Sequence, residues 1–180
     1  MKKYLMLILF LIGTNIAVAQ EKFSYNQNGL TPVYLINKVD SLSQTELFEK
    51  SLEWVKKNYK NPNEVIKATI LNKMIRIEGL TPKWICIESL GTTFCSDALY
   101  TIEFEFKEGR YKFEVFSLTF VSQNGNYKVN LSNGKDYYRK NGKLKQFTKD
   151  TPQAISDLFN RLNEELNNYI LGKDKSDKDW

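Results

Sequence analysis

The sequence predicts an α+β domain of two layers, in which two helices cover one face of a single antiparallel sheet. Two stretches, 43–59 and 151–172, carry apolar residues at spacings of three and four, which is typical of amphipathic helices. Between them, several short runs alternate apolar and polar residues, as half-buried strands do. The expected order is β-α-β-β-β-β-α. Each helix must bury its one apolar stripe, and one face of the sheet can receive both.

The first strand is expected at 33–39, and the first helix follows it. Ser43 and Glu46 have the spacing of a capping box, in which the hydroxyl bonds a free N–H of the first turn and the carboxylate reaches back. The helix ends at Asn61–Pro62, because proline disfavours helical geometry in the residue before it. Its apolar stripe comprises Leu47, Phe48, Leu52, Trp54, Val55 and Tyr59.

Strands and tight turns are expected next. Two short strands, "EVIKATIL" and "MIRIEG", flank a turn at Asn72–Lys73. The clearest hairpin spans 99–120 and turns at Glu108–Gly109, where glycine accepts a positive φ. Beyond Val115 the alternation slips by one residue, which predicts either a β-bulge or a strand that passes from one packing partner to another. The opposed apolar pairs are Phe106 with Tyr111, Phe104 with Phe113, and Ile102 with Val115.

The two cysteines, Cys86 and Cys95, lie in a further predicted hairpin with its turn at Leu90–Gly91. This turn places them opposite each other on a non-hydrogen-bonded pair, where Cα atoms lie ~4.5 Å apart and a disulfide fits. We therefore expect a structural disulfide. Free buried thiols and a redox pair are the alternatives, although the spacing is not the C-x-x-C of many redox sites.

The segment 122–149 differs from the rest of the chain. It contains Asn-Gly three times, which predicts small hairpins that decorate the domain. Its seven basic residues accompany a single acid, Asp136. Such a surface could bind an anionic glycan, lipid headgroups or an acidic protein, or its lysines could simply prevent edge pairing. The residues of this possible ligand surface are Lys128, Lys135, Tyr137, Tyr138, Arg139 and Lys140.

The second helix is expected over 151–172. Thr151 suits the N-cap, Pro152 the first helical position and Gly172 the end. A charged tail, 173–180, follows. We expect a single α+β domain over 20–172, because a chain of this length can bury ~70% of its surface.

The N-terminus has the three parts of a secretory signal peptide. A positively charged start precedes an apolar run, and small residues then precede a cleavage site between Ala19 and Gln20. The run is too short for a membrane-spanning helix, which needs ~20 apolar residues. We expect residues 1–19 to be removed and the mature chain to be exported, periplasmic or secreted, with no stable membrane span.

The composition excludes several kinds of site. The chain has no histidine, so a Ser-His-Asp triad and a histidine-ligated metal site are impossible, and no cofactor is indicated. Residues 20–180 carry 24 basic and 21 acidic residues, a mild excess that does not indicate nucleic acid as a partner. The carboxylates Glu103, Glu105 and Glu114 share one hairpin face. We interpret them as a solvated surface rather than a cation site or an acid–base pair, because no third ligand or nucleophile accompanies them.

Several segments resemble one known family. The helix "ELFEKSLEWVKKNYKNPNEVI", the strand "KMIRIEG" and the hairpin "YTIEFEFKEGRYKFEVFSLTF" are similar to the exported bacterial family called domain of unknown function 4468. The resemblance covers about residues 33–120. It implies a fold like that of the TATA-binding protein, and it implies no catalytic residues. The motif that carries it comprises Trp54, Asn58, Tyr59, Glu64, Val65 and Ile66.

These observations favour an exported binding or envelope-accessory module with an unknown ligand. Its partner is expected to be an envelope protein or an anionic glycan, bound on the open sheet face or on segment 122–149. An envelope enzyme that uses glutamate, tyrosine or lysine on glycans is the alternative, as is an inhibitor of another secreted protein.

Overall fold

The computed structural model describes residues 21–89 and 91–173. The predicted signal peptide, its cleavage between Ala19 and Gln20 and the tail beyond Lys173 lie outside the described residues. The elements are β1 Ser24–Asn26, β2 Gly29–Thr31, β3 Tyr34–Lys38, α1 Gln44–Asn58, α2 Pro62–Val65, β4 Ile66–Ile70, β5 Met74–Ser89, β6 Thr92–Lys107, β7 Arg110–Ser122, β8 Gly125–Lys128, the 3₁₀ helix η2 Gln146–Thr148 and α3 Thr151–Ile170.

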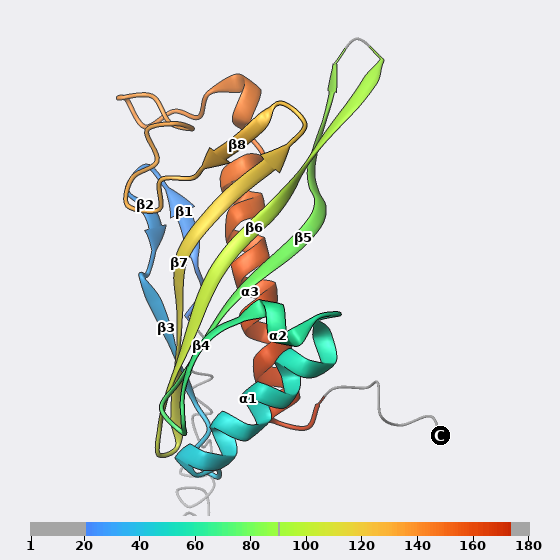
Figure 1. The fold of residues 1–180 in the computed structure, drawn as a ribbon. Helices are drawn as coiled ribbons and strands as arrows, with labels where there is room; N and C mark the ends of the chain where they lie inside the picture. The colour runs from blue at the N-terminus through green and yellow to red at the C-terminus, as the bar shows by residue number, and fades with distance from the viewer. Residues whose placement is uncertain (1–20, 90, 174–180) are drawn as a thin grey trace, which may run out of the picture.

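The main sheet is antiparallel and follows the order β3-β7-β6-β5-β4, with β8 paired to β7 (Figure 1). The predicted α+β class is confirmed. The expected element order is present in β3, α1, β4 to β7 and α3. The structure adds the small β1–β2 hairpin and the single turn α2, which the sequence patterns did not indicate. The short strand β8 belongs to the hairpins expected in segment 122–149.

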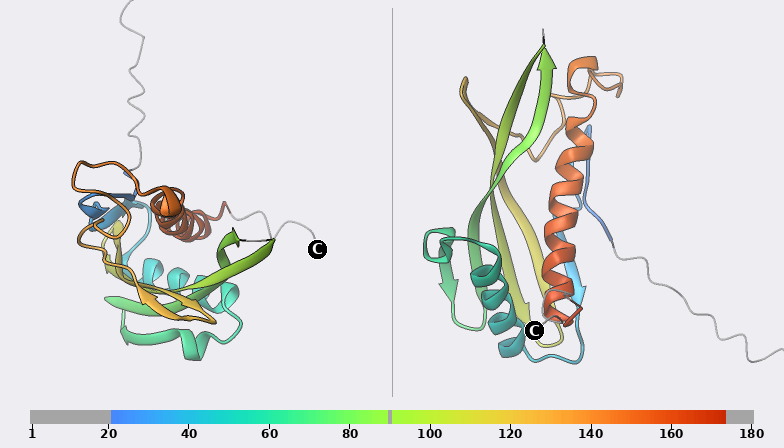
Figure 2. Two further views of the ribbon diagram at one scale, coloured as in Figure 1. Left: turned by 90° about the horizontal axis from the view of Figure 1, so that it is seen from above. Right: turned by 90° about the vertical axis from the view of Figure 1, so that its right-hand side faces the viewer.

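Both long helices lie on one side of this sheet, as the right-hand view of Figure 2 shows. Aromatic rings on the inner face of the sheet contact both helices. Phe104 of β6 lies 6.1 Å, between ring centroids, from Trp54 of α1. Tyr100 of β6 lies 6.3 Å from Phe159 of α3. The other face of the sheet is therefore left open.

The central hairpin has the predicted register. Phe104 pairs with Phe113 and Glu103 with Glu114, and the ladder shifts between Thr101 and Ile102. This shift is a bulge, one of the two alternatives that the sequence left open, and it leaves Phe116 half-exposed on the open face. The capping box of α1 is also present, with Ser43 and Glu46 bonded to each other as predicted.

The cysteine segment does not form a separate hairpin. Strands β5 and β6, 16 residues each, run without interruption from the sheet into the segment that contains both cysteines. Residues 82–84 of β5 have no paired partner on β6, and Lys83 has a φ of 48°. Pairing resumes at Ile85, so the strands continue past Pro82. We call residues 82–97 the arm. It extends beyond the rest of the molecule at the top of Figure 1.

Helix α3 begins one position earlier than predicted. Thr151 is its first residue, and Asp150 is the N-cap without a side-chain bond, so Thr151 is not the cap. The N–H of Ala154 donates to the carbonyl of Asp150, which brings Thr151 into the helix. Pro152 still lies in the first turn, where its missing N–H needs no partner. Gly172 has a φ of 65° and ends the helix as expected.

The N-terminal segment is anchored along α3. The side-chain amide of Asn160 accepts from the N–H of Phe23 at 2.8 Å and donates to the carbonyl of Phe23 at 2.9 Å. The hydroxyl of Ser156 accepts from the N–H of Tyr25. These bonds replace the sheet partner that β1 lacks on this side. They fix the β1–β2 hairpin at the end of the molecule where segment 122–149 also lies (Figure 1).

Candidate functional site

The segment 122–149 forms one end of the molecule, at the upper left of Figure 1. The predicted hairpins are present only as β7–β8 and as a single bridge between Tyr138 and Leu144. The rest is irregular, and its backbone bonds both within the segment, as from the N–H of Arg139 to the carbonyl of Lys143, and to the β1–β2 hairpin. The N–H of Leu30 donates to the carbonyl of Leu131 at 2.8 Å, and the N–H of Gly134 donates to the carbonyl of Gln27 at 3.0 Å.

The exposed basic residues of this segment define what we call the basic end. The four predicted cationic residues are all exposed, and two further lysines join them. Within residues 21–89 and 91–173, none of the six forms an ion pair with a carboxylate. The six are Lys128, Lys135, Arg139, Lys140, Lys143 and Lys149.

The two tyrosines predicted for the ligand surface have another role. Tyr137 is only 4% exposed and packs edge-on against Tyr25, so it cannot present a surface to a ligand. Burial raises its pKa above the ordinary value for tyrosine. Tyr138 is half-buried, and its hydroxyl donates to the carbonyl of Tyr25. Both rings therefore hold the segment on the β1–β2 hairpin, and the prediction for Tyr137 is wrong.

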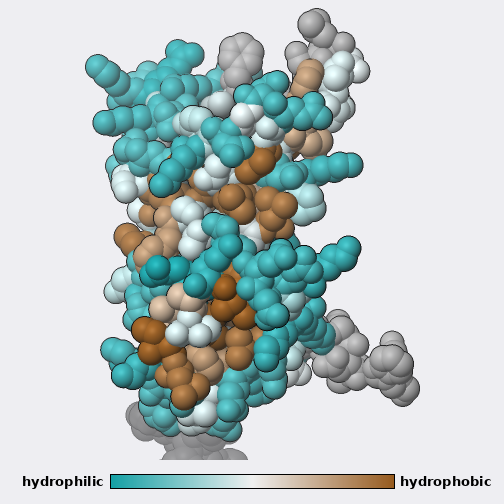
Figure 3. All heavy atoms as spheres, in the orientation of Figure 1, coloured by the Kyte–Doolittle hydropathy of each residue, from teal (hydrophilic) through white to brown (hydrophobic). Residues whose placement is uncertain are grey.

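The single acid of the segment does not neutralise the basic end. Burial and the neighbouring Asp136 carboxylate raise the pKa of Tyr127 to about 12, and Asp136 forms no ion pair among the described residues. The seventh basic residue, Lys145, lies inward, where its ammonium donates to the carbonyls of Lys135 and Asp136 at 2.8 and 3.0 Å. Hydrophilic side chains cover this end of the surface in Figure 3.

The open sheet face is the second candidate surface. Glu103 and Glu114 are opposed, as the register predicted. Arg76 lies 2.6 Å from the Glu103 carboxylate, and Lys112 bridges Glu114 and Glu105. Although burial lowers the pKa of Lys112, its hydrogen bonds to Glu105 and Glu114 raise it above the ordinary value. Two cations therefore neutralise the three carboxylates, because Lys112 is shared by Glu105 and Glu114. Glu103 is buried under Arg76, so the interpretation as a solvated face fails for this residue.

Apolar side chains are scattered over this face, and brown patches appear at the centre and lower left of Figure 3. Tyr34 and Ile36 of β3 are about half-exposed. They line an open depression of about 370 Å³ together with Lys112. Lys107 and Arg110 also line the depression, and both are exposed without an ion pair among the described residues. The depression therefore offers two such cations, fewer than the basic end.

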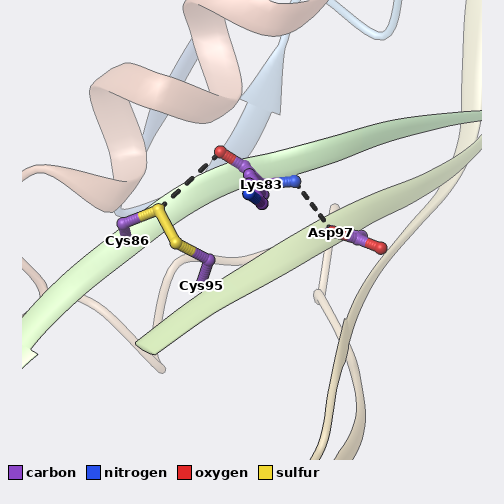
Figure 4. The surroundings of a disulfide bond; sticks show 4 residues. All are labelled: Lys83, Cys86, Cys95 and Asp97. Atoms are coloured by element: carbon purple, nitrogen blue, oxygen red, sulfur yellow. Dashed lines mark hydrogen bonds between the residues drawn. A yellow bond between two sulfur atoms is a disulfide. The ribbon is translucent and has the colours of Figure 1, made fainter. Parts of the chain in front are cut away.

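The structure contains the predicted disulfide between Cys86 and Cys95, with Cα atoms 4.0 Å apart (Figure 4). The opposed register agrees with the turn expected at positions 90–91. Next to it, the N–H of Lys83 donates to the Asp97 carboxylate at 2.8 Å and fixes the irregular part of β5. The sulfurs therefore link the two strands of the arm.

No sequence pattern indicated a groove beside the arm. This groove has a volume of about 700 Å³ and lies between β6 and the turn that joins β7 to β8. Ile85, Phe94 and Val121 are its apolar lining residues. A comparison of the lengths of β6 and β7 could have indicated the groove, because β6 is longer and continues past the point where β7 turns away.

The described residues contain no group of three or more histidine, cysteine, aspartate or glutamate side chains that could hold a metal ion. In the same part of the chain, no helix is both long and apolar enough to cross a membrane. The free ammonium and guanidinium groups of the basic end can attract and bond anionic groups, and this is the chemistry that the exposed side chains offer most clearly.

Three comparisons relate this chain to known proteins. A family model described as "Domain of unknown function (DUF4468) with TBP-like fold" matches residues 35–135. A crystal structure of a DUF4468 family protein from Bacteroides ovatus is similar with a TM-score of 0.65 and 15% identity, over 76% of this chain and 84% of that one. A crystal structure of a TBP-like protein from Parabacteroides distasonis gives a TM-score of 0.50 and 15% identity, over 77% and 88%. At this identity the two structures indicate the fold alone. No curated protein matches significantly.

Proposed function

Because the chain belongs to the DUF4468 family, whose description gives a TBP-like fold and no function, we propose a role from its own surface: it is an exported module that binds an anionic polysaccharide at the basic end. The observation that carries this proposal is the group of six exposed cationic side chains without carboxylate partners among the described residues.

The charge of the chain is unevenly distributed, which supports this surface over others. Segment 122–149 has seven basic residues and one acid. The rest of 20–180 has 17 basic and 20 acidic residues, so it is slightly negative. Clustered like charge creates a local potential that concentrates anions, whereas the mild net charge of the whole chain would not.

Neighbouring side chains favour a sugar polymer over an acidic protein. The Tyr127 ring is 44% exposed next to Lys128, and an exposed aromatic face can pack on the apolar face of a sugar ring. The exposed amides of Asn126 and Asn141 can donate to and accept from hydroxyl groups. Cations, amides and an aromatic ring together suit a ligand that carries acidic groups, hydroxyls and rings.

Export is supported by the disulfide as well as by the N-terminal pattern. Disulfides form and persist in the periplasm and outside the cell, and they are rare in the cytosol. The pair Cys86–Cys95 is therefore consistent with a protein that meets envelope polysaccharides. An exported protein meets little nucleic acid, so we do not interpret the basic end as a nucleic-acid site.

The test uses heparin as the anionic polysaccharide probe and residues 20–180 with the disulfide intact. We expect retention on a heparin column at ~0.15 M salt, where screening over ~8 Å leaves only clustered charge effective. The variant Lys135→Gln/Arg139→Gln/Lys140→Gln is expected to elute at clearly lower salt. These three side chains are exposed, so the substitutions should leave the fold intact.

A matched control removes the same charge elsewhere. The variant Lys38→Gln/Lys56→Gln/Lys60→Gln changes three exposed lysines outside segment 122–149, and it should elute like the wild type. Equal shifts for both variants would show that net charge alone causes retention. That result, or no retention of the wild type, would contradict the proposal.

A further inference from the structure

One edge of β6 has no partner in the arm. Strand β6 continues to Thr92, but its neighbour β7 turns away at Ser122, and Asp97–Val121 is the last pair between them. From Thr92 to Ser96, β6 therefore pairs only with β5. The groove of about 700 Å³ is lined by this stretch of β6, by Lys83 and Ile85 of β5, and by residues 121–124 where β7 turns away.

The register shows which backbone groups are unpaired. Cys86 and Cys95 are a non-hydrogen-bonded pair, because the hairpin closes on a two-residue turn between Ser89 and Thr92. The N–H and C=O groups of Thr93 and Cys95 therefore point away from β5 and towards the groove. Among the described residues, neither has a backbone partner on that side.

This edge also lacks the usual protection against pairing. Free strand edges are normally blunted by proline, charge or a bulge. The β5 side of the arm carries Pro82 and Lys83 in an irregular stretch. The stretch Thr92–Ser96, with the sequence TTFCS, has no charge and no proline, and its Phe94 side chain is 53% exposed.

The disulfide gives this edge a fixed shape. None of the described residues of the arm, 82–97, belongs to the buried core, so the Cys86–Cys95 link holds the strands of the arm rather than the centre of the molecule (Figure 4). A preformed strand edge loses less conformational freedom when a ligand binds.

We propose that the groove is a strand-addition site that binds an extended polypeptide segment of a partner protein. The segment lies antiparallel to β6, in line with β7, and exchanges backbone hydrogen bonds with Thr93 and Cys95. One of its apolar side chains packs against Phe94 and Ile85. An extended peptide is the occupant because it presents alternating donors and acceptors at the spacing of the β6 edge.

The chain itself provides no strand for this position within its described residues. Strand β8 folds back along the opposite edge of β7, and α3 ends at the other end of the molecule from the arm (Figure 1). The site is separate from the basic end, and it does not depend on the proposed polysaccharide.

The test begins with a displayed library of random heptapeptides, selected on the oxidised chain 20–180. Selected peptides are then synthesised and bound to the protein in solution. We expect the amides of Thr93 and Cys95 to become protected from hydrogen exchange. N-methylation of alternate peptide residues should weaken binding about tenfold, the effect of roughly one hydrogen bond, while the residues between them tolerate it.

Two exposed apolar residues give matched variants. Phe94→Ser should weaken peptide binding about tenfold. Leu71→Ser, at a position that is 77% exposed in the β4–β5 turn, should have no effect. Protection at other amides, an N-methyl scan without alternation, equal effects of the two variants, or a selection without binders would each overturn the proposal.

Discussion

At the scale of single residues, the open face of the sheet depends on one arginine. Glu103 is only 6% exposed and lies opposite a second carboxylate, Glu114. The Arg76 guanidinium bonds Glu103 and lies 4.8 Å from the centre of the half-exposed Phe116 ring. The bulge places the Phe116 ring next to the Arg76 guanidinium, so this ring partly shields the Arg76–Glu103 ion pair from water.

We expect Arg76→Gln to lower the free energy of unfolding by about 2 kcal/mol, because it leaves Glu103 buried without its cation. The cost stays below that of a fully buried pair, since Arg76 is partly exposed. Adding Glu103→Gln to this variant should restore part of the loss. Urea unfolding of both variants measures the effect, and equal stability of the single and double variants would contradict it.

The Tyr127 phenol gives a pH dependence at the basic end. Its folded pKa of about 12 lies above the ordinary value of 10.0 because of burial and the neighbouring Asp136 carboxylate. A raised pKa means that the phenol adds stability below pH 10, and that this stability is lost as the pH rises towards 12.

NMR titration of the Tyr127 ring should therefore find it protonated at pH 11. Asp136→Asn should lower the pKa, because the neighbouring negative charge is removed. An unchanged pKa in this variant would show that burial alone is responsible.

At the scale of elements, the short-range patterns were sufficient for most of the fold. The capping box of Ser43, the turn at Glu108–Gly109 and the cysteine register all follow from neighbouring residues, and each is present. The length of the arm could not be predicted in this way. A proline such as Pro82 commonly ends a strand, but here Thr81 and Ile85 both pair with β6, so the strand continues on both sides of the proline.

The variant Cys86→Ser/Cys95→Ser should lower the local stability of the arm more than the global stability of the protein. The chain-entropy model gives roughly 3 kcal/mol for closing such a short loop. Because the arm lies outside the core, we expect the change in global unfolding free energy to be clearly smaller. Hydrogen exchange should show lost protection for amides of the arm but not for the β6–β7 hairpin near Phe104. Equal losses in both places would contradict this account.

At the scale of the whole molecule, the two helices close one face of the sheet, and positive charge collects at one end. Lys128, Lys135, Arg139 and Lys140, which the sequence assigned to a possible ligand surface, are all exposed, since charged side chains rarely lie in a core. Their binding of a ligand stays a prediction. Tyr137 was assigned wrongly because a tyrosine in a polar loop can face either way. Its burial depends on Tyr25, which is more than a hundred residues away and which no local pattern connects to it.

The most direct test is an amide chemical-shift map of the oxidised chain 20–180 titrated with a short heparin oligosaccharide. The account predicts saturable shifts that centre on residues 126–143 and weaken as salt rises. Shifts centred on the open sheet face around Tyr34 and Ile36, or no saturable shifts at low salt, would contradict the proposal that the basic end is the binding surface.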